Sequence, residues 1–151
     1  LETYFRAANS FVLLVRAEGT IVGATTAILA SEEEESFRAP LLRAGLDPRQ
    51  VCYFGESILL PPFRGLGLGK VFFREREAFA RRLPGVSTLA FCAVVRAESH
   101  PLRPSDYRPL DSLWRTQGFA PAPGMTTEYE WPDVGTDGPS KKLMQYWIKQ
   151  V

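Results

Sequence analysis

Residues 61–70 carry the residue types and spacing best suited to chemistry: Pro-Pro-Phe-Arg-Gly-Leu-Gly-Leu-Gly-Lys. The alternating glycines Gly65, Gly67 and Gly69 leave the main chain open to close approach by a ligand. A helix that begins in this stretch would present unpaired backbone N–H groups and the positive end of its dipole. Arg64 and Lys70 add positive charge. The stretch therefore predicts a site for a phosphate or pyrophosphate group.

Two widespread phosphate-binding motifs do not fit this stretch. A P-loop has a glycine five residues before its Gly-Lys pair and a hydroxyl residue after it, whereas this chain has Arg64 and Val71 there. A dinucleotide fingerprint G-x-G-x-x-G that starts at Gly65 would need a third glycine at Lys70. A glycine-rich turn without a ligand is the alternative. The strand expected before it (residues 53–60) and the helix expected after it (residues 68–83) favour a ligand.

Glu56 is the second candidate, because it lies between Phe54 and Ile58 in the apolar run of residues 51–60. A carboxylate buried in such a strand is costly unless it is paired or functional. Burial would raise its pKa toward the range in which it can take a proton from an ammonium group. The alternative is a structural ion pair between Glu56 and one of the many arginines, so both roles stay open.

Two stretches resemble the GNAT acetyltransferase superfamily. Residues 58–65, Ile-Leu-Leu-Pro-Pro-Phe-Arg-Gly, lead into an R-G-x-G-x-G pattern that resembles the family's strand and coenzyme A pyrophosphate loop. Residues 113–119, Leu-Trp-Arg-Thr-Gln-Gly-Phe, are similar to the family's helix that ends in Gly-Phe before a strand. In element order the resemblance covers residues 11–148.

The resemblance implies an N-acetyltransferase that transfers an acetyl group from acetyl-CoA to a primary amine of a small molecule or peptide. The amine would attack the thioester directly in a ternary complex, and Glu56 would accept its proton directly or through water. The backbone of residues 58–60 would hold the pantetheine arm, and residues 64–70 the pyrophosphate. The cofactor-binding residues implied are Ile58, Leu59, Leu60, Arg64, Gly65, Leu66, Gly67, Leu68, Gly69 and Lys70.

The chain departs from the family pattern at the group that would protonate the leaving thiolate. Trp114 lies where many relatives have a tyrosine, and Tyr107 replaces the usual Asn. The acid is then Tyr107, water or no dedicated group, and Trp114 is expected to pack against the core or the cofactor. His100, the only histidine, is either a second acid or base, an acceptor contact, or a loop histidine tied to backbone. A non-catalytic acyl-CoA-binding regulatory or accessory domain, and a nucleotide-binding module, remain alternatives.

Hydrophobic patterning predicts one α/β domain over residues 1–151 with its sheet covered on both faces, and the resemblance implies a GNAT-like three-layer α-β-α arrangement. Its mixed sheet is expected to be mainly antiparallel with a central parallel strand pair. We expect a hairpin from residues 11–15 and 21–28, a short helix over 37–44, the parallel pair from 51–60 and 87–95, and a last pair from 126–131 and 143–148. The helix over 68–83 is expected to bury a stripe that excludes Arg76. Compared with the family, the first strand and helices are missing or reduced to residues 1–8.

Composition narrows the function further. The chain has 45% hydrophobic residues, enough for a real core, and a formal charge of +1 with dispersed Lys and Arg, which argues against a nucleic-acid partner. Cys52 and Cys92 stand apart and predict buried thiols in a reducing compartment. We expect a cytoplasmic protein with no membrane partner and no metal. The acidic residues 31–36 predict a solvated loop or a first helical turn, or else a lip that attracts a cationic amine. The oligomeric state, a homodimer or otherwise, stays open.

Overall fold

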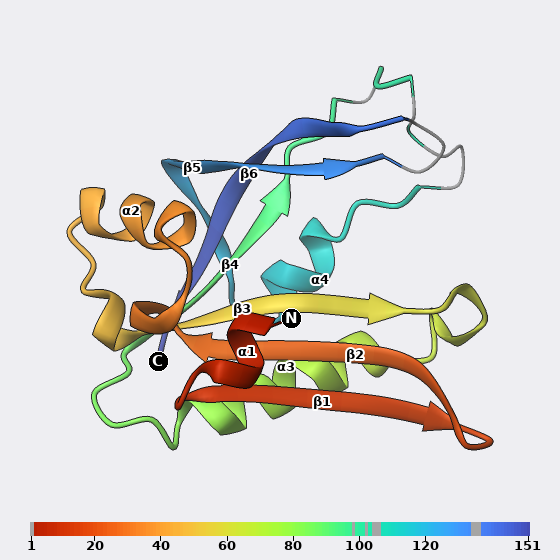
Figure 1. Cartoon of the computed structure of the whole chain (residues 1–151), viewed down its shortest axis with the longest axis horizontal. Coiled ribbons are helices and arrows are strands. Elements are labelled where there is room, and N and C mark those ends of the chain that lie inside the picture. The colour runs from red at the N-terminus through yellow and green to blue at the C-terminus, as the bar shows by residue number, and fades with distance from the viewer. Residues whose placement is uncertain (1, 98, 102, 104–106, 134–136) are drawn as a thin grey trace.

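A computed structural model of the chain describes residues 2–97, 99–101, 103, 107–133 and 137–151 (Figure 1). Its helices are α1 (Glu2–Arg6), α2 (Glu35–Arg43), α3 (Leu68–Ala80) and α4 (Asp111–Thr116). Its strands are β1 (Ser10–Ala17), β2 (Thr20–Leu29), β3 (Val51–Leu59), β4 (Thr88–Val94), β5 (Ala120–Pro132) and β6 (Pro139–Gln150). The sheet has the order β1-β2-β3-β4-β6-β5, and among the described residues β3 and β4 are parallel while the other neighbouring strands are antiparallel. The predicted mixed sheet is confirmed.

The first hairpin forms because its turn residues accept the required backbone. Glu18 and Gly19 both have positive φ, 48° and 81°, as a tight two-residue hairpin turn demands. Strands β1 and β2 pair from Ser10↔Ile28 to Ala17↔Thr20. The predicted hairpin is therefore confirmed.

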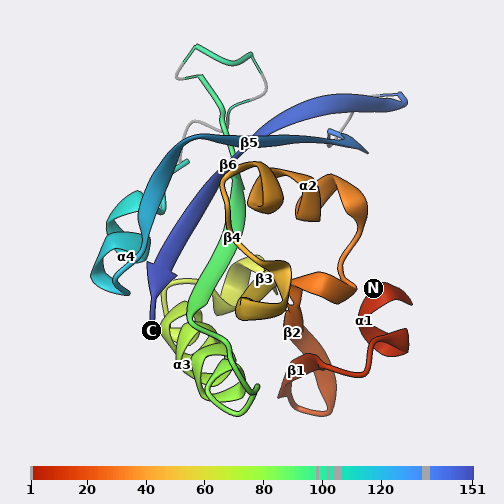
Figure 2. The same ribbon diagram turned by 90° about the vertical axis from the view of Figure 1, so that its left-hand side faces the viewer.

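Helices cover both faces of the sheet, as predicted. Figure 2 shows α3 and α4 on one face and α1 and α2 on the other. Each face has its own apolar cluster: Ile28, Leu41, Tyr53 and Tyr146 belong to one, and Phe54, Phe73, Phe91 and Phe119 belong to the other. Among the described residues, no helix has both the length and the apolar character required to cross a membrane.

Helix α3 corrects one prediction. It ends at Ala80 rather than Leu83, and its buried residues are Phe72, Phe73, Arg76, Phe79 and Ala80. Positions 72, 73, 76, 79 and 80 form one face at helical periodicity, so Arg76 lies on the core face and not off it. Its guanidinium carbon lies 4.4 Å from the ring centroid of Phe54 and 4.7 Å from that of Phe73.

The parallel pair β3–β4 is short and then opens. It joins Val51 to Thr88, Cys52 to Leu89 and Tyr53 to Ala90. After these pairs β3 continues to Leu59 and β4 to Val94, but the two strands no longer pair with each other. Figure 1 shows the two strands diverging. We call residues 51–54 the closed segment of β3 and residues 55–59 its open segment. The closed segment is buried throughout, whereas the open segment is largely exposed and, within the part of the chain that the structure describes, pairs with β2 alone.

Candidate functional site

The loop between β3 and α3 takes the shape that its glycines allow. Gly65 and Gly67 have left-handed φ angles of 75° and 82°, and Gly67 is the N-cap of α3 with no side-chain cap. A Cβ added at either glycine would meet no atom of the described residues within 4 Å. Backbone conformation, and not crowding by the rest of the chain, therefore selects glycine at these two positions.

This loop leaves a run of main-chain donors free. The backbone N–H groups from Gly65 to Gly69 find no acceptor among the residues that the structure describes, and the first helical bond there is from the Lys70 N–H to the Gly67 carbonyl, at 3.0 Å. Lys70 is exposed. The Arg64 Nε donates to the Leu59 carbonyl at 3.0 Å, which ties the loop to the end of β3. Free amides, a helix N-terminus and two cations form a cradle that suits a diphosphate.

The open segment of β3 lies directly before this cradle in the chain. Its edge toward β4 has no strand partner, so an extended ligand can bond to it as an added strand would. Exposed apolar side chains follow this edge into the loop: Ile58 of the open segment is 52% exposed, Leu60 just after it 46%, and Leu66 of the loop 69%. An edge of this kind fits an arm that combines amide groups with an alkyl chain.

Glu56 lies at a β-bulge in the open segment. Thr25 pairs with Ser57 and Ala27 pairs with Phe54, so Gly55 and Glu56 together lie opposite Thr26. The Glu56 N–H donates to the Thr26 Oγ1 at 2.9 Å, and the Thr25 hydroxyl donates to the Glu56 carbonyl at 2.8 Å. Both the backbone N–H and the backbone carbonyl of Glu56 are thus hydrogen-bonded to side chains of β2.

The Glu56 side chain is exposed, so its predicted burial is wrong. The physical reason is the divergence of β4, which leaves this half of β3 without a neighbour on one side. The predicted alternative, an ion pair with an arginine, does not form either, because no other described residue bonds to the Glu56 carboxylate. The carboxylate is therefore free to meet a ligand.

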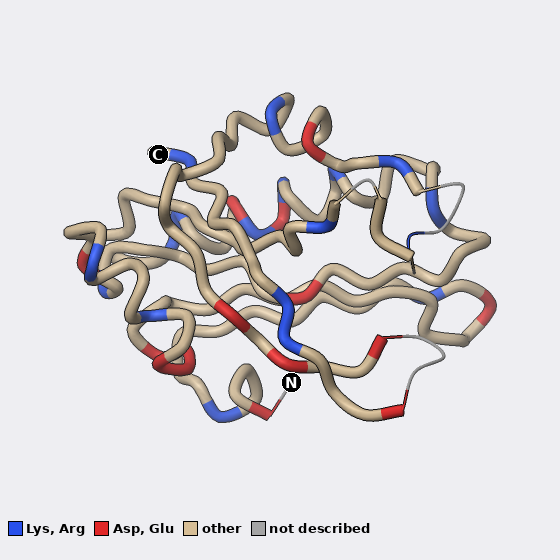
Figure 3. Tube along the Cα trace, turned by 90° about the horizontal axis from the view of Figure 1, so that it is seen from above, with Lys and Arg blue, Asp and Glu red and all other residues tan. Residues whose placement is uncertain are grey.

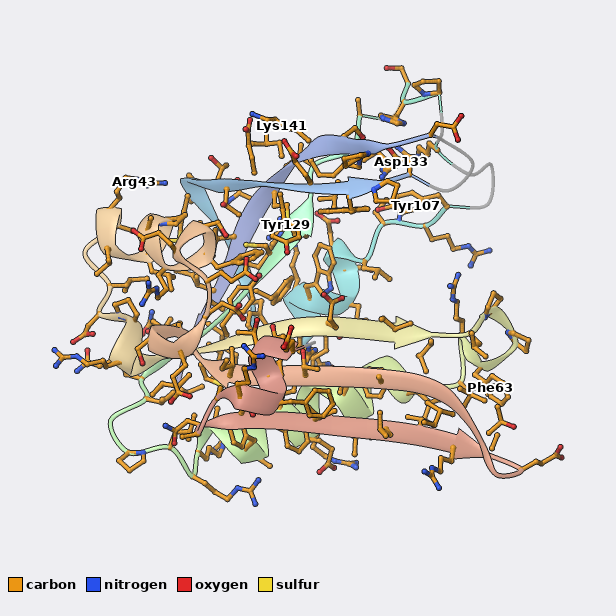
Figure 4. All side chains as sticks on the ribbon, viewed as in Figure 1. Arg43, Phe63, Tyr107, Tyr129, Asp133 and Lys141 are labelled. Atoms are coloured by element: carbon orange, nitrogen blue, oxygen red, sulfur yellow. The ribbon has the colours of Figure 1, made fainter. Side chains whose placement is uncertain are left out.

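Tyr129 of β5, which no local sequence signal singled out, is electrostatically coupled to Glu34, Glu33 and Glu56. The charge of Glu34, together with partial burial and the charges of Glu33 and Glu56, raises the pKa of Tyr129. The Tyr129 ring lies 5.3 Å from that of Phe37 in α2, and Figure 4 shows it between the β5–β6 hairpin and β3. Nothing local in the sequence predicts this proximity, because it depends on how β5 crosses α2.

The acidic stretch at residues 31–36 is only partly solvated. Glu34 and Glu35 are exposed, as predicted for a first helical turn, and Glu32 bonds to Asn9. Glu33 contradicts that prediction: it is 7% exposed and accepts a 2.9 Å hydrogen bond from the Tyr4 hydroxyl. Burial raises the pKa of Glu33 above its usual value.

The structure does not connect the other two predicted catalytic residues to Glu56. Tyr107 is 41% exposed on the connection to α4, with the Arg103 guanidinium 4.8 Å from its ring centroid (Figure 4). The backbone N–H of His100 donates to the Ala97 carbonyl at 3.1 Å. Glu98, Leu102 and residues 104–106 of this loop lie outside the described residues. The acid and base roles of Tyr107 and His100 stay predictions.

Trp114 packs in the core, as predicted. Its ring lies 5.2 Å from that of Phe91 and 4.9 Å from that of Trp147. The two cysteines are free thiols, and burial raises the pKa of Cys52 and of Cys92 to about 12. Neither thiol is therefore an ionised nucleophile near neutral pH.

Charges of both signs alternate along the chain, and Figure 3 shows no continuous basic stripe along the part of the trace that it colours. This distribution agrees with the dispersed Lys and Arg of the sequence. The positive charge beside the cradle comes from Arg64 and Lys70.

No protein-family model matches the chain, and no curated protein matches it in sequence. Solved structures do match. An acetyltransferase of the GNAT family from Streptococcus pneumoniae aligns with a TM-score of 0.58 at 13% identity, over 99% of this chain and 72% of that one. An IAA acetyltransferase from Bacillus cereus aligns with a TM-score of 0.60 at 13% identity, over 99% and 81%.

A third match was solved with a ligand. A putative streptothricin acetyltransferase from Bacillus anthracis, in complex with acetyl coenzyme A, aligns with a TM-score of 0.60 at 11% identity, over 99% of this chain and 67% of that one. At sequence identities of 11–13% these matches show a shared fold and no more than that. The chain thus has the fold of the GNAT acetyltransferases, as the resemblance of its sequence predicted.

Proposed function

We propose that the protein is an N-acetyltransferase that transfers an acetyl group from acetyl-CoA to a primary amine. One observation carries this proposal: the free N–H groups from Gly65 to Gly69 lie beside the unpartnered edge of the open segment. A diphosphate joined to an extended amide-bearing arm matches that pair of features, and coenzyme A has both parts. The likeness to an acetyltransferase solved with acetyl-CoA supports the same ligand.

Residues 64–70 would hold the diphosphate, and the backbone of Ile58, Leu59 and Leu60 would hold the pantetheine arm. The bound coenzyme supplies the thioester, whose acyl carbon is activated toward a nitrogen nucleophile. Glu56, exposed at the bulge, takes the proton that the amine loses as its nitrogen bonds to that carbon and the C–S bond breaks. The departing sulfur takes a proton from Tyr107 or from water.

A direct attack by the amine fits the thiols of this chain. A covalent acyl-enzyme would need an ionised cysteine, and burial holds the pKa of both Cys52 and Cys92 at about 12. The acceptor should be cationic in its resting form, because the carboxylates of Glu34 and Glu56 stand around Tyr129. Such a surface attracts an ammonium group, which loses one proton to water before the attack and leaves Glu56 to take the second as the nitrogen bonds to the acyl carbon. His100 is proposed as a contact to the acceptor.

Thermal unfolding with acetyl-CoA, CoA and ATP tests the ligand. A cofactor at 100 times its dissociation constant stabilises the folded state by about 2.7 kcal/mol, so CoA and acetyl-CoA should raise the melting temperature and ATP should not. Turnover is then measured with tyramine, spermidine and lysine methyl ester as amines. Glu56→Gln should abolish turnover while the stabilisation by CoA survives.

A second candidate, a non-catalytic acyl-CoA-binding domain, is favoured by Trp114. This residue packs in the core at the position of the family's acid and carries no hydroxyl group. Stabilisation by CoA without turnover of any amine would select this alternative. Stabilisation by ATP alone would instead select a nucleotide-binding module.

A further inference from the structure

Two buried ionisable side chains have no part in the chemistry just described. Glu33 is 7% exposed and Arg76 is 3% exposed, and neither forms a salt bridge with another residue that the structure describes. Burying a charge without a counter-charge is costly, and an apolar side chain of similar size would avoid that cost. Each must therefore be explained by what it bonds to.

The Arg76 guanidinium begins a chain of hydrogen bonds that ends at Glu56. Its Nη1 donates to the Ser57 Oγ at 3.0 Å, and the Ser57 Oγ lies 3.2 Å from the Thr25 Oγ1. The Thr25 hydroxyl donates its only proton to the Glu56 carbonyl at 2.8 Å. Ser57 must then be the donor to Thr25, so every bond in this chain points from Arg76 toward Glu56.

A second chain leaves Glu56 on the other side and ends at Glu33. The Glu56 N–H donates to the Thr26 Oγ1 at 2.9 Å. The Thr26 Oγ1 and the Tyr4 hydroxyl oxygen both lie against Gly55, and the Tyr4 hydroxyl donates to the Glu33 Oε2 at 2.9 Å. These two bonds run in the same direction, because the Glu56 N–H donates to Thr26 and the Tyr4 hydroxyl donates to Glu33.

The charges at the two ends match this direction. A cation stands at the donor end and a carboxylate at the acceptor end, so both ends favour one orientation of all the hydroxyl groups between them. Gly55 makes room for the arrangement: a Cβ there would lie 1.9 Å from the Tyr4 hydroxyl oxygen and 2.7 Å from the Thr26 Oγ1.

We propose that Glu33 and Arg76 are positioning residues, which fix the β-bulge from opposite faces of the sheet and so aim the Glu56 carboxylate at the acceptor amine. This inference rests on the proposed function, since it assigns Glu56 the role of base. Neither residue touches the amine or the coenzyme; both act through the main chain of Glu56.

Cutting each chain at a hydroxyl group tests the proposal. The variants are Tyr4→Phe, Ser57→Ala and Arg76→Met, with Ser57→Thr as the variant that keeps a hydroxyl. Arg81→Met is the matched control, because it removes the same charge just after α3 from a side chain that is 70% exposed. For each variant we would measure kcat and KM with acetyl-CoA and spermidine, the dissociation constant of CoA, and hydrogen exchange at the Glu56 and Ser57 amides without ligand.

We expect Tyr4→Phe, Ser57→Ala and Arg76→Met to lower kcat at least tenfold while the dissociation constant of CoA changes less than twofold. Exchange at Glu56 and Ser57 should become at least tenfold faster, with β6 unchanged. Ser57→Thr and Arg81→Met should behave as the wild type. If Arg76→Met does not fold, Ser57→Ala decides for that chain.

Wild-type kcat and wild-type exchange in Tyr4→Phe and Ser57→Ala would overturn the proposal. Equal losses in kcat and CoA affinity, or faster exchange throughout the sheet, would also overturn it, because they describe general destabilisation. The exchange measurement separates this failure from failure of the proposed function. A wild-type protein that binds no CoA would refute the function, whereas fast exchange confined to the bulge would still show that the chains hold it.

Discussion

The two halves of β3 belong to one strand and have opposite properties. The closed segment, residues 51–54, has strand neighbours or apolar packing on all sides and is buried. The open segment, residues 55–59, keeps β2 on one edge and loses β4 on the other. The closed segment serves stability, and the open segment presents a carboxylate, a free edge and the entrance to the glycine loop.

The divergence of β4 is what separates the two roles. A sheet interior satisfies its backbone and side chains internally, so it has nothing to offer a ligand. Past Tyr53 and Ala90 β3 is no longer paired with β4, and hydroxyl groups from Thr25 and Thr26 hold its exposed backbone in place. The comparison predicts that substitutions in the two halves will affect different measurements.

The largest effect on stability is expected from Phe54→Ala in the closed segment. Phe54 is 1% exposed and packs 5.9 Å from the Phe119 ring and under the Arg76 guanidinium. Removing such a ring costs about 3–5 kcal/mol, a large part of a domain's stability. Ile58→Ala in the open segment should stay within about 0.5 kcal/mol, as exposed positions do. Urea unfolding of the ligand-free proteins measures both.

Equal losses for Phe54→Ala and Ile58→Ala would contradict the division of β3. In the presence of acetyl-CoA the difference between the two variants should become smaller. Ile58→Ala should then lose part of the stabilisation that the ligand gives the wild type. Phe54→Ala should keep this stabilisation by the ligand under all conditions in which the variant is folded.

Gly67→Ala should lower both the stability of the ligand-free protein and the stabilisation by CoA. Gly67 has φ of 82°, and an L residue in that conformation costs about 1–2 kcal/mol. Gly85, just beyond the other end of α3, has φ of 78° and equally open surroundings. Gly85→Ala should therefore cost about the same stability, whereas Gly67→Ala alone should reduce the thermal shift with CoA. An unchanged shift for Gly67→Ala would remove the diphosphate from this loop.

Local patterns predicted the elements and the loop well. Alternating apolar runs, the turn at Glu18 and Gly19 and the glycines before α3 act over a few residues, so their consequences are written in the sequence itself. The mixed sheet, the parallel pair and the packing of Trp114 followed from the same reading and from the family resemblance.

What the sequence did not predict depends on distant neighbours. Glu56 was expected to be buried because the apolar run is continuous, but its environment is set by where β4 leaves. Arg76 was placed off the buried stripe because arginine is normally exposed, yet Phe54 and Phe73 provide two rings to hold it. Tyr129, on a strand far along the chain, is electrostatically coupled to Glu56. No local signal carries such information.

Glu33→Gln should reveal the buried acid behind the open segment through pH. Burial raises the pKa of Glu33 in the folded state, so folding favours the neutral form. Its contribution to stability is therefore full below its unfolded pKa and is lost as pH rises through the folded pKa. The melting temperature of Glu33→Gln minus that of the wild type should accordingly increase between pH 4 and pH 7. A difference that stays constant or decreases over this range would show that ionisation of Glu33 does not destabilise the folded state.

The smallest expected effect is that of Lys70→Met, which should increase the stability of the ligand-free protein and decrease its affinity for CoA. Lys70 places a positive charge in the first turn of α3, where the helix dipole disfavours it, and the residue is exposed. Lys70→Met should therefore stabilise the ligand-free protein by about 0.3–1 kcal/mol at low ionic strength, an effect that salt should screen. The same variant should bind CoA several-fold more weakly, because the diphosphate loses a cation. Lys141→Met, which removes an exposed charge from β6 beside Glu128, should change neither the stability nor the affinity for CoA.

Calorimetric titration with CoA measures the loss of affinity, and unfolding in low and high salt measures the gain in stability. A Lys70→Met variant that lost stability and kept its affinity would mean that the loop is built for the fold and not for an anion.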